Sequence, residues 1–330
     1  MNKTLTYLET GSKNPYYNLA FEEYVLCNRL EGDYLLLWQN ENTIVIGQHQ
    51  NAEAEINRAF VEAHRINVVR RTTGGGAVYH DLGNLNYSFI TDVGEASQLN
   101  MELFIRPVVE ALKGLNLNAK ASGRNDILVD SKKISGVAQR IAGNRILHHG
   151  TLLFDSNTGM LAGALRVKPG KFHSKAVKSV RSRIGNIRDF LEKDMDLPAF
   201  WNYLKQFFGE EKMISGTLTD VELAEVEHLK QMKYDTWDWN FGRSPAYNMS
   251  NERRWNGGSL EVRARVEDGW ITEMYFYGDF LARKSLDDIL DKFKGCPFQR
   301  EFIEERIKEI PIEEYFGGIS LEEVLQTIFL

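Results

Sequence analysis

Three consecutive glycines, Gly74, Gly75 and Gly76, follow two arginines, Arg70 and Arg71. Glycine has no Cβ atom, so a ligand can lie close to the backbone N–H groups, and the backbone can adopt positive φ. Arginine stays charged and presents forked donors that match the oxygens of a carboxylate or a phosphate. We call these three glycines the glycine loop. Taken alone, they are as compatible with a flexible surface loop as with a ligand site. Next to two arginines, they predict a site for an anionic ligand.

A lysine after a predicted hairpin turn is the second candidate. Asn125 and Asp126 precede two apolar runs within residues 127–138, and residues 130–132 between the runs predict a turn. Lys133 then lies at the start of a strand, where packing restricts its backbone. A lysine beside a turn is most often only solvated, so its position alone is weak evidence for a chemical role.

Two adjacent histidines, His148 and His149, lie in an apolar run over residues 146–154 that predicts another strand. Neighbouring residues in a strand point to opposite faces, so these two side chains do not share one metal ion. A zinc site is therefore not expected here.

Residues 166–188 carry only positive charge. The segment contains a Pro-Gly turn signal and no acidic residue. It is either a solvated loop or a flap that closes over a polyanion and makes favourable contacts only when phosphates are bound. Its basic residues are Arg166, Lys168, Lys171, Lys175, Lys178, Arg181, Arg183 and Arg188.

The glycine loop is predicted to connect two strands. Residues 66–69 before it and residues 85–90 after it alternate between apolar and polar side chains. A loop held at both ends by strands is a better candidate for ligand binding than for a linker. Earlier in the chain, the apolar residues 34–38 and 43–47 predict a buried hairpin across a polar connection.

The chain is expected to form two domains. The aromatic, turn-rich residues 237–248 end a first domain over residues 1–248, and residues 249–258, rich in Asn, Arg and Gly, predict a linker. Residues 259–330 then begin with a clear hairpin and predict a small α+β unit. Helices are predicted over residues 15–30, 51–64, 99–115, 198–208, 220–232, 285–293, 299–307 and 320–328.

The composition excludes several classes of protein. A net charge of −6 over 330 residues argues against a dedicated nucleic-acid binder, which usually carries a strongly basic face. The two cysteines, Cys27 and Cys296, support neither a disulfide framework nor a cysteine zinc site. No signal-peptide core or membrane-spanning run is present, so we expect a cytoplasmic protein without membrane or nucleic-acid partners. The P-loop, dinucleotide-binding, zincin and nucleophile-elbow motifs are also absent.

Five motifs, in order, resemble those of the lipoate-protein ligase family. They are residues 70–84, 123–126, 133–136, 148–153 and 179–183, and residues 237–248 are similar to the family's closing motif. The resemblance implies an α+β (mixed α/β) catalytic domain like those of class II aminoacyl-tRNA synthetases and biotin protein ligases, with a small accessory C-terminal domain. It also implies an AMP-forming reaction in which lipoate and ATP-Mg²⁺ give lipoyl-AMP. The lipoyl group then passes to a lysine of lipoyl-domain proteins, the E2 subunits of 2-oxoacid dehydrogenases or the glycine-cleavage H protein.

The resemblance also implies roles for individual residues. Lys133 matches the catalytic lysine that bonds both the lipoyl carbonyl oxygen and the phosphate, and Asp126 matches a Mg²⁺ ligand. Residues 175–183 resemble an adenylate-binding flap, and an apolar tunnel for the dithiolane is expected to be lined by Trp38, Val45 and Gly75. Relatives often have a basic residue in place of Gln48, which leaves its role open. The implied substrate- or nucleotide-binding residues are Arg70, Arg71, Gly74, Gly75, Gly76, Ala77, Val78, Tyr79, Asn125, Asp126, Lys133, His149, Gly150, Thr151 and Arg181.

Two other functions stay open. An ATP-independent lipoyl or octanoyl transferase of the same fold would need a thiolate nucleophile, and Cys27 on a helix and Cys296 in the second domain are badly placed for one. A non-catalytic lipoate or nucleotide sensor would need neither Lys133 nor an accessory domain. A biotin ligase that represses transcription is disfavoured, because no DNA-binding helix pair precedes the first domain.

Overall fold

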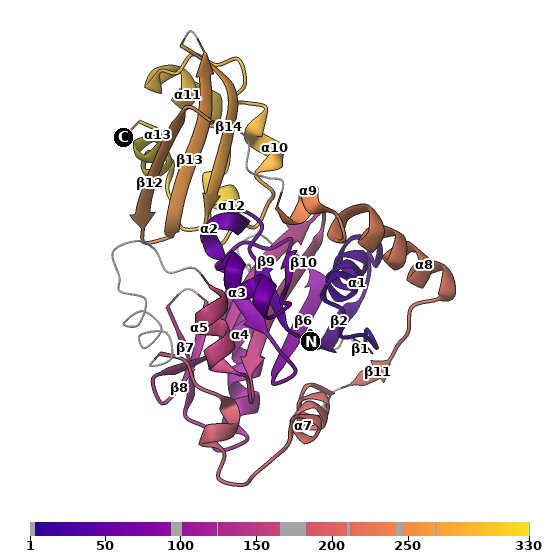
Figure 1. The fold of residues 1–330 in the computed structure, drawn as a ribbon. Helices are drawn as coiled ribbons and strands as arrows, with labels where there is room; N and C mark the ends of the chain where they lie inside the picture. Colours follow the sequence, from indigo (N-terminus) through magenta and orange to yellow (C-terminus); the bar gives the residue numbers. More distant parts are fainter. Residues whose placement is uncertain are drawn as a thin grey trace.

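The computed structural model describes residues 4–93, 101–123, 125–165, 183–209, 212–241, 247–267 and 269–329, apart from the side chains of residues 53 and 54. Within these ranges, a large mixed sheet with helices on both faces is followed by a small α+β unit, which stands at the top in Figure 1. The predicted fold class, an α+β catalytic domain with an accessory C-terminal domain, is confirmed.

The large sheet has the strand order β11-β1-β2-β6-β10-β9-β8-β7. Pairing is antiparallel from β2 to β7, whereas β1 pairs in parallel with both β2 and β11. The strands are β1 (Leu5–Leu8), β2 (Asp33–Trp38), β6 (Asn84–Asp92), β7 (Ala119–Ser122), β8 (Asp126–Val129), β9 (Lys132–Ala142), β10 (Arg145–Leu153) and β11 (Met213–Ser215).

Helix α1 (Pro15–Asn28) covers one face of this sheet, beside α8 (Asp220–Leu229) and a π-helical turn, η3 (Lys230–Tyr234). Asn14 caps α1 by accepting the backbone N–H groups of Tyr16 and Tyr17, as expected for Asn before a helix-starting proline. Helices α4 (Met101–Lys113) and α7 (Leu197–Gly209) pack on the opposite face. Because β2 alternates between these two cores, all of its last four residues are buried.

The predicted hairpin of residues 34–38 and 43–47 is wrong. Strand β2 belongs to the large sheet, and β3 (Thr43–Ile46) is the centre of a separate sheet between β4 (Asn67–Arg70) and β5 (Val78–His80). Both runs are apolar throughout, so periodicity could not show which partner each strand chooses. The connection between them contains the buried Asn40, whose side chain accepts a hydrogen bond from Asn18 of α1.

Several predicted helices form with altered limits. The helix predicted over residues 51–64 is two short ones, α2 (Ala52–Glu55) and α3 (Arg58–Ala63), because Asn57 caps the second by accepting the N–H of Phe60. Pro107 lies inside α4, which runs through it. Further helices of this part are α5 (Thr158–Ala164), η2 (Ile187–Phe190) and α9 (Trp237–Asn240). None of the helices in the described ranges is long and apolar enough to cross a membrane.

The C-terminal unit packs helices on a three-stranded antiparallel sheet, β12-β13-β14. Residues 249–258, predicted as a linker, instead contain strand β12, which pairs with β13 along its whole length. Its residues alternate between half-buried and exposed, so an edge strand with a charged outer face resembles a linker in composition. The elements are β12 (Met249–Trp255), β13 (Gly258–Glu267), β14 (Trp270–Gly278), α10 (Asp287–Leu290), α11 (Arg300–Ile307), α12 (Ile312–Phe316) and α13 (Leu321–Ile328).

Candidate active site

A cavity of about 100 Å³ lies on the α1 face of the large sheet, next to the glycine loop. Its wall combines an apolar part, which includes Trp38 and Val45, with a polar part that includes Asn125 and Lys133. The lining residues are Leu19, Trp38, Val45, Arg71, Gly76, Ala77, Val78, His80, Asn86, Asn125, Lys133, Gly136, Val137, Ala138, His149, Gly150 and Thr151.

One row of residues across the large sheet lies along this cavity. Trp38 pairs with Asn86, and Asn86 pairs with Thr151. The Gly136 amide donates to the Thr151 hydroxyl at 3.1 Å, and Gly136 pairs with Asp126. Residues opposite each other in antiparallel strands point to the same face, and neighbouring strands lie about 4.8 Å apart. The row therefore spans roughly 19 Å, with Trp38 at one end and Asp126 at the other.

Lys133 occupies the polar end of the cavity. Its Nζ forms an ion pair with Asp126 Oδ1 at 2.7 Å, and both side chains are about one third exposed. The predicted hairpin that places Lys133 is confirmed: β8 and β9 join through Asp130 and Ser131, both with positive φ. A Cβ atom at Gly136 would lie 3.2 Å from Nζ, so the glycine leaves room for the ammonium group above the strand.

Arg71 holds the shape of the glycine loop from inside. Its side chain is buried, and it donates to the carbonyl oxygens of Gly74 (2.7 Å), Gly76 (2.9 Å) and Val45 (3.2 Å). Its Nε donates to the Thr73 hydroxyl at 2.9 Å. Burial lowers the pKa of Arg71 to about 10, partly offset by Glu22, so the guanidinium stays charged at neutral pH.

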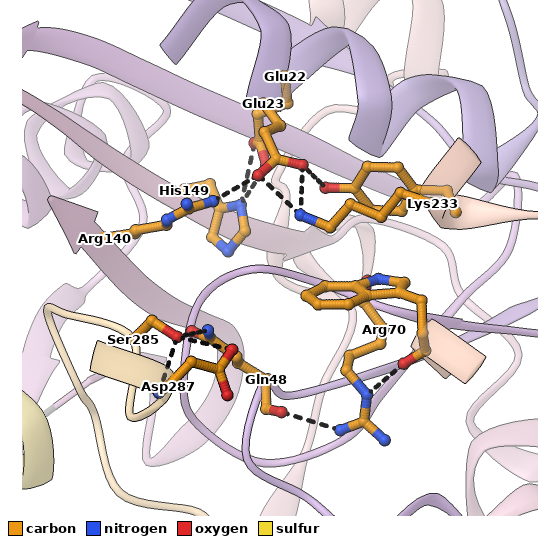
Figure 2. Close-up of polar contacts among 11 residues, drawn as sticks. Glu22, Glu23, Gln48, Arg70, Arg140, His149, Lys233, Ser285 and Asp287 are labelled. Atoms are coloured by element: carbon orange, nitrogen blue, oxygen red, sulfur yellow. Dashed lines mark hydrogen bonds and ion pairs between the residues drawn. The ribbon is translucent and has the colours of Figure 1, made fainter. Parts of the chain in front are cut away.

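Arg70 is placed differently, away from the cavity lining. Its guanidinium is fully buried and donates to the carbonyl oxygens of Gly47, Gln48, Gln50, Trp239 and Asn240 at 2.6–3.1 Å. Figure 2 shows two of these contacts, one to the carbonyl oxygen of Gln48 and one to the carbonyl oxygen of Trp239 in α9. Arg70 thus joins the loop of residues 47–50 to α9, whereas Arg71 borders the cavity.

A buried chain of hydrogen bonds connects Arg71 to α1. The Thr73 hydroxyl lies 2.8 Å from His149 Nε2, and His149 Nδ1 lies 2.9 Å from Glu22 Oε1. The Glu22 carboxylate only accepts, so Nδ1 of His149 carries a hydrogen and donates to it. Ser88 also donates to Glu22, at 2.5 Å. These contacts hold the His149 ring in a fixed orientation, facing the cavity.

The next residue of α1, Glu23, is the centre of a second buried cluster (Figure 2). It accepts from Arg140 Nη1, from Lys233 Nζ and from the Tyr234 hydroxyl, each at 2.8 Å. Burial alone would raise the pKa of Glu23, but Lys233 and Arg140 outweigh it and hold the pKa below its usual range. The cluster joins α1, β9 and η3 behind the cavity wall.

Glu22, His80 and Asn86 belong to the site but were not among the predicted residues. The signal for Glu22 was available, since residues 19–26 put two adjacent carboxylates into an otherwise apolar helix, and buried carboxylates need partners. His80 lies within the motif of residues 70–84 and Asn86 lies two residues after it, but their side chains could not be assigned to the cavity without the strand pairing.

Most of the predicted site residues meet at the cavity. Trp38 and Val45 line it as expected, and Asp126 is held at its edge by Lys133. Tyr79 does not line it; its ring is buried under the small sheet, and its hydroxyl donates to Asn42. Arg181 and most of the basic segment lie outside the described residues. The predicted residues in the lining are Arg71, Gly76, Ala77, Val78, Asn125, Lys133, His149, Gly150 and Thr151.

Gly74 and Gly75 contact the accessory domain instead. The Gly75 amide donates to the carbonyl oxygen of Phe280 at 3.1 Å, and a Cβ atom at Gly74 would lie 2.5 Å from that same oxygen. Gln48 takes part in this interface, because its Nε2 donates to the Ser285 hydroxyl at 3.0 Å (Figure 2). The accessory domain therefore touches two loops next to the site.

Two family models match this chain in order along its length. Residues 14–209 match the lipoyl protein ligase A/B catalytic domain, and residues 244–328 match the bacterial lipoate protein ligase C-terminus. Among curated relatives, lipoate–protein ligase 1 of Staphylococcus aureus is 42% identical over 317 residues, which is 96% of this chain and 97% of that protein.

Solved structures agree with the family models. A Plasmodium falciparum LipL1 structure in complex with lipoate covers 98% of both chains with a TM-score of 0.82 at 24% identity, a likeness of fold. An archaeal bipartite lipoate protein ligase with its E2 lipoyl domain, from Thermoplasma acidophilum, is 30% identical over 76% of this chain and all of that one, with a TM-score of 0.66. A lipoate-protein ligase A bound with ATP is 28% identical over 73% and 99%, with a TM-score of 0.63. With both family models matched and a relative this similar over almost its whole length, the chain belongs to the lipoate-protein ligase family.

Proposed function

We propose that this chain activates lipoate with ATP-Mg²⁺ to lipoyl-AMP and then transfers the lipoyl group to a specific lysine of lipoyl-domain proteins. The observation that carries the proposal is the polarity of the cavity. Lys133 and Asn125 stand at one end, and Trp38 and Val45 stand at the other. An acid with a polar carboxylate and an apolar tail fits this arrangement, with the carboxylate beside Lys133.

Adenylation brings two anions together. A carboxylate oxygen of lipoate attacks the α-phosphorus of ATP, the bond from that phosphorus to the oxygen bridging to the β-phosphorus breaks, and pyrophosphate leaves. The ammonium group of Lys133 is positioned to stabilise the negative charge that accumulates on the carboxyl and phosphoryl oxygens. The Gly76 to Val78 backbone in the cavity wall lies open to a phosphate or an adenine, since a Cβ atom at Gly76 would meet nothing within 4 Å.

Asp126 fits the expected role toward Mg²⁺. In the described ranges, no three His, Cys, Asp or Glu side chains are grouped so that they could hold a metal ion. Mg²⁺ typically uses one or two carboxylates together with substrate phosphates, so a single carboxylate beside the α-phosphate is sufficient. Bound there, Mg²⁺ would supply charge neutralisation to the phosphates, while the Asp126 carboxylate also orients Lys133.

In the second step, the neutral amine of an acceptor lysine attacks the lipoyl carbonyl carbon. A C–N bond forms, the C–O bond to the phosphate breaks, AMP leaves, and the new amide loses a proton to solvent. The solved archaeal relative with its E2 lipoyl domain supports lipoyl domains as acceptors. The E2 subunits of 2-oxoacid dehydrogenases and the glycine-cleavage H protein are the acceptors that we propose, and a cytoplasmic location stays a prediction.

The positions of the cysteines favour ligation over thioester-based transfer. Neither Cys27 nor Cys296 lines the cavity, and Cys296 is buried in the accessory domain. Burial raises the pKa of both thiols, which disfavours the thiolate that transfer from an acyl-enzyme requires.

The test is lipoate-dependent exchange of labelled pyrophosphate into ATP, with purified protein and Mg²⁺ and without an acceptor protein. Exchange that requires lipoate is expected and identifies the adenylate half-reaction. Acyl transfer from a lipoylated protein without exchange would instead identify an amidotransferase. Absence of both activities, with retained lipoate binding, would identify a sensor.

A further inference from the structure

Two side chains in the cavity wall carry polar atoms that have no protein partner in the described part of the chain. They are Nε2 of His80 and Nδ2 of Asn86, and the two residues are only 3% and 2% exposed. A buried polar atom without a partner costs free energy, so each such atom calls for an explanation. These two border the space that a ligand would fill.

The hydrogen-bond network shows which ring nitrogen of His80 carries the hydrogen. Asn18 Nδ2 donates to the carbonyl oxygens of Ser12 (3.1 Å) and Gln39 (2.7 Å), which fixes its amide orientation. The Asn40 atom that faces it at 2.9 Å is therefore the oxygen Oδ1. Asn40 then presents its Nδ2 to His80 Nδ1 at 3.1 Å, so Nδ1 accepts and Nε2 carries the hydrogen.

His80 is neutral at physiological pH. Burial, and then the charges of Arg71 and His149, lower its pKa to about 3. The ring is thus a neutral N–H donor and not a cation that would attract a second carboxylate. A weak or soft acceptor suits such a donor, because a fully charged partner would have to be desolvated without a counter-charge.

This donor lies at the apolar end of the cavity. Asn86 stands next to Trp38 in the row across the sheet, three strand spacings, or about 14 Å, from Asp126. The His80 ring packs edge-on against Trp38, with centroids 6.3 Å apart. The other wall residues at this end, Leu19 and Val45, offer no hydrogen-bonding side chain. A ligand tail reaching this end therefore meets the N–H donors of His80 and Asn86 beside the apolar side chains of Trp38, Leu19 and Val45.

We propose that the Nε2–H of His80, with the amide of Asn86 beside the same space, recognises a weakly accepting atom in the ligand tail, namely a ring sulfur of lipoate. Divalent sulfur is a weak acceptor that is well accommodated among apolar groups. His80 is then a specificity-determining residue that favours a dithiolane over a purely hydrocarbon tail of similar shape. This inference rests on the proposed use of lipoate as the substrate.

A buried water molecule is the other way to satisfy these atoms. The Asn84 Oδ1 oxygen, which does not line the cavity, is also without a protein partner in the described part, and one water could bridge it to His80 and Asn86. In that case the tail of the ligand would make no hydrogen bond, and the protein would not distinguish sulfur from carbon. The two cases therefore differ in whether the protein prefers lipoate to an analogue that lacks the ring sulfurs.

The experiment measures equilibrium binding to the full-length protein by calorimetry, without ATP. The probes are lipoate and 5-cyclopentylpentanoate, in which a cyclopentane ring replaces the dithiolane. One neutral hydrogen bond is worth about a three- to tenfold change in affinity. We expect His80→Phe to lower the ratio of lipoate affinity to analogue affinity by that factor through weaker lipoate binding, with the affinity for the analogue retained.

His148→Phe is the matched control. His148 is also a buried neutral histidine with an unpartnered Nε2, but it packs against Phe104 on the opposite face of the sheet and does not line the cavity. The ratio of lipoate affinity to analogue affinity in His148→Phe should equal that of the wild type. An unchanged ratio in His80→Phe, with both acids still bound, would overturn the proposal in favour of the water.

A structure of the wild-type protein with lipoate keeps the test independent of how well His80→Phe folds. A ring sulfur within hydrogen-bonding distance of His80 Nε2 supports the proposal, whereas a water in that position contradicts it. Failure of the proposed function looks different. If neither acid binds and neither supports pyrophosphate exchange, the ligase function fails before specificity is tested.

Discussion

The ammonium group of Lys133 lies 2.7 Å from Oδ1 of Asp126, at the end of the cavity opposite Trp38. Asp126 begins β8, and Lys133 lies near the beginning of β9, so the short turn between these strands brings acid and base together. The pair is too exposed to contribute much to stability. In the proposed adenylation, the pair holds one positive charge beside the reacting carboxylate and phosphate oxygens.

Replacing Lys133 by Ala should therefore reduce activity and leave the fold intact. By analogy with the loss of one pre-organised oxyanion donor, we expect lipoate-dependent pyrophosphate exchange to fall about a hundredfold or more. The melting temperature should stay close to that of the wild type. Lys132→Ala is the control, because neighbouring strand residues point to opposite faces. Near-normal exchange by Lys133→Ala would remove Lys133 from the chemistry.

Replacing two glycines near the site by alanine should have different effects, on stability at Gly47 and on ATP binding at Gly76. A Cβ atom at Gly47 would lie 2.0 Å from the Gly75 carbonyl oxygen, so Gly47→Ala should destabilise the protein by about 1–3 kcal/mol. Gly76→Ala meets no neighbour within 4 Å, so its stability should change by less than about 0.5 kcal/mol. If ATP lies against Gly76, that variant should instead lose about five- to hundredfold in ATP affinity.

Thermal unfolding and calorimetric titration with ATP separate the two effects. A Gly76→Ala protein that melts and binds ATP like the wild type would show that the ligand does not touch this residue. A Gly47→Ala protein of normal stability would contradict the close approach of the two loops.

The role of Gln48 can be decided with Ser285. If Gln48 only joins the two domains, Gln48→Ala and Ser285→Ala should have the same effect on pyrophosphate exchange and on stability. The double variant should then be no worse than either single one, with a coupling free energy of about 0.5–1.5 kcal/mol from thermal unfolding. A larger loss of exchange in Gln48→Ala than in Ser285→Ala would indicate a direct contact with ligand.

Mild acid should destabilise the protein through its buried histidines. Burial lowers the pKa values of His80 and His148 to about 3, whereas both titrate near 6.5 in the unfolded chain. Between these values the unfolded state binds more protons, so stability is present above pH 6.5 and is lost as the pH falls. Each residue contributes a slope of up to about 1.4 kcal/mol per pH unit.

Urea unfolding at several pH values from 7 to 5 measures this slope. His148→Gln lowers stability at every pH but should remove about half of the histidine-dependent slope. An unchanged slope in that variant would show that His148 is protonated in the folded state.

Features formed by residues close together in the sequence were predictable, whereas contacts between residues far apart in the sequence were not. The β8–β9 hairpin was predictable because its turn, its strands and Lys133 are neighbours in the chain. The glycine loop was also recognised, but its division was not: Gly76 borders the cavity, whereas Gly75 bonds to Phe280, some two hundred positions later. Arg70 and Arg71 were equivalent in the sequence, and only the strand pairing turns their side chains to different partners.

The partners of Arg70 and Glu23 also bear on how the protein is made. Arg70 binds carbonyl oxygens of Trp239 and Asn240, and Glu23 binds Lys233, so these contacts join residues about 170 and 210 positions apart. Contacts this distant in sequence form late, because closing long loops costs chain entropy before the contacts can repay it. While a nascent chain ends before residue 233, Arg70 lacks its contacts to Trp239 and Asn240, and Glu23 has Arg140 but lacks Lys233 and Tyr234. The active site is therefore expected to mature only after the ribosome has passed α9.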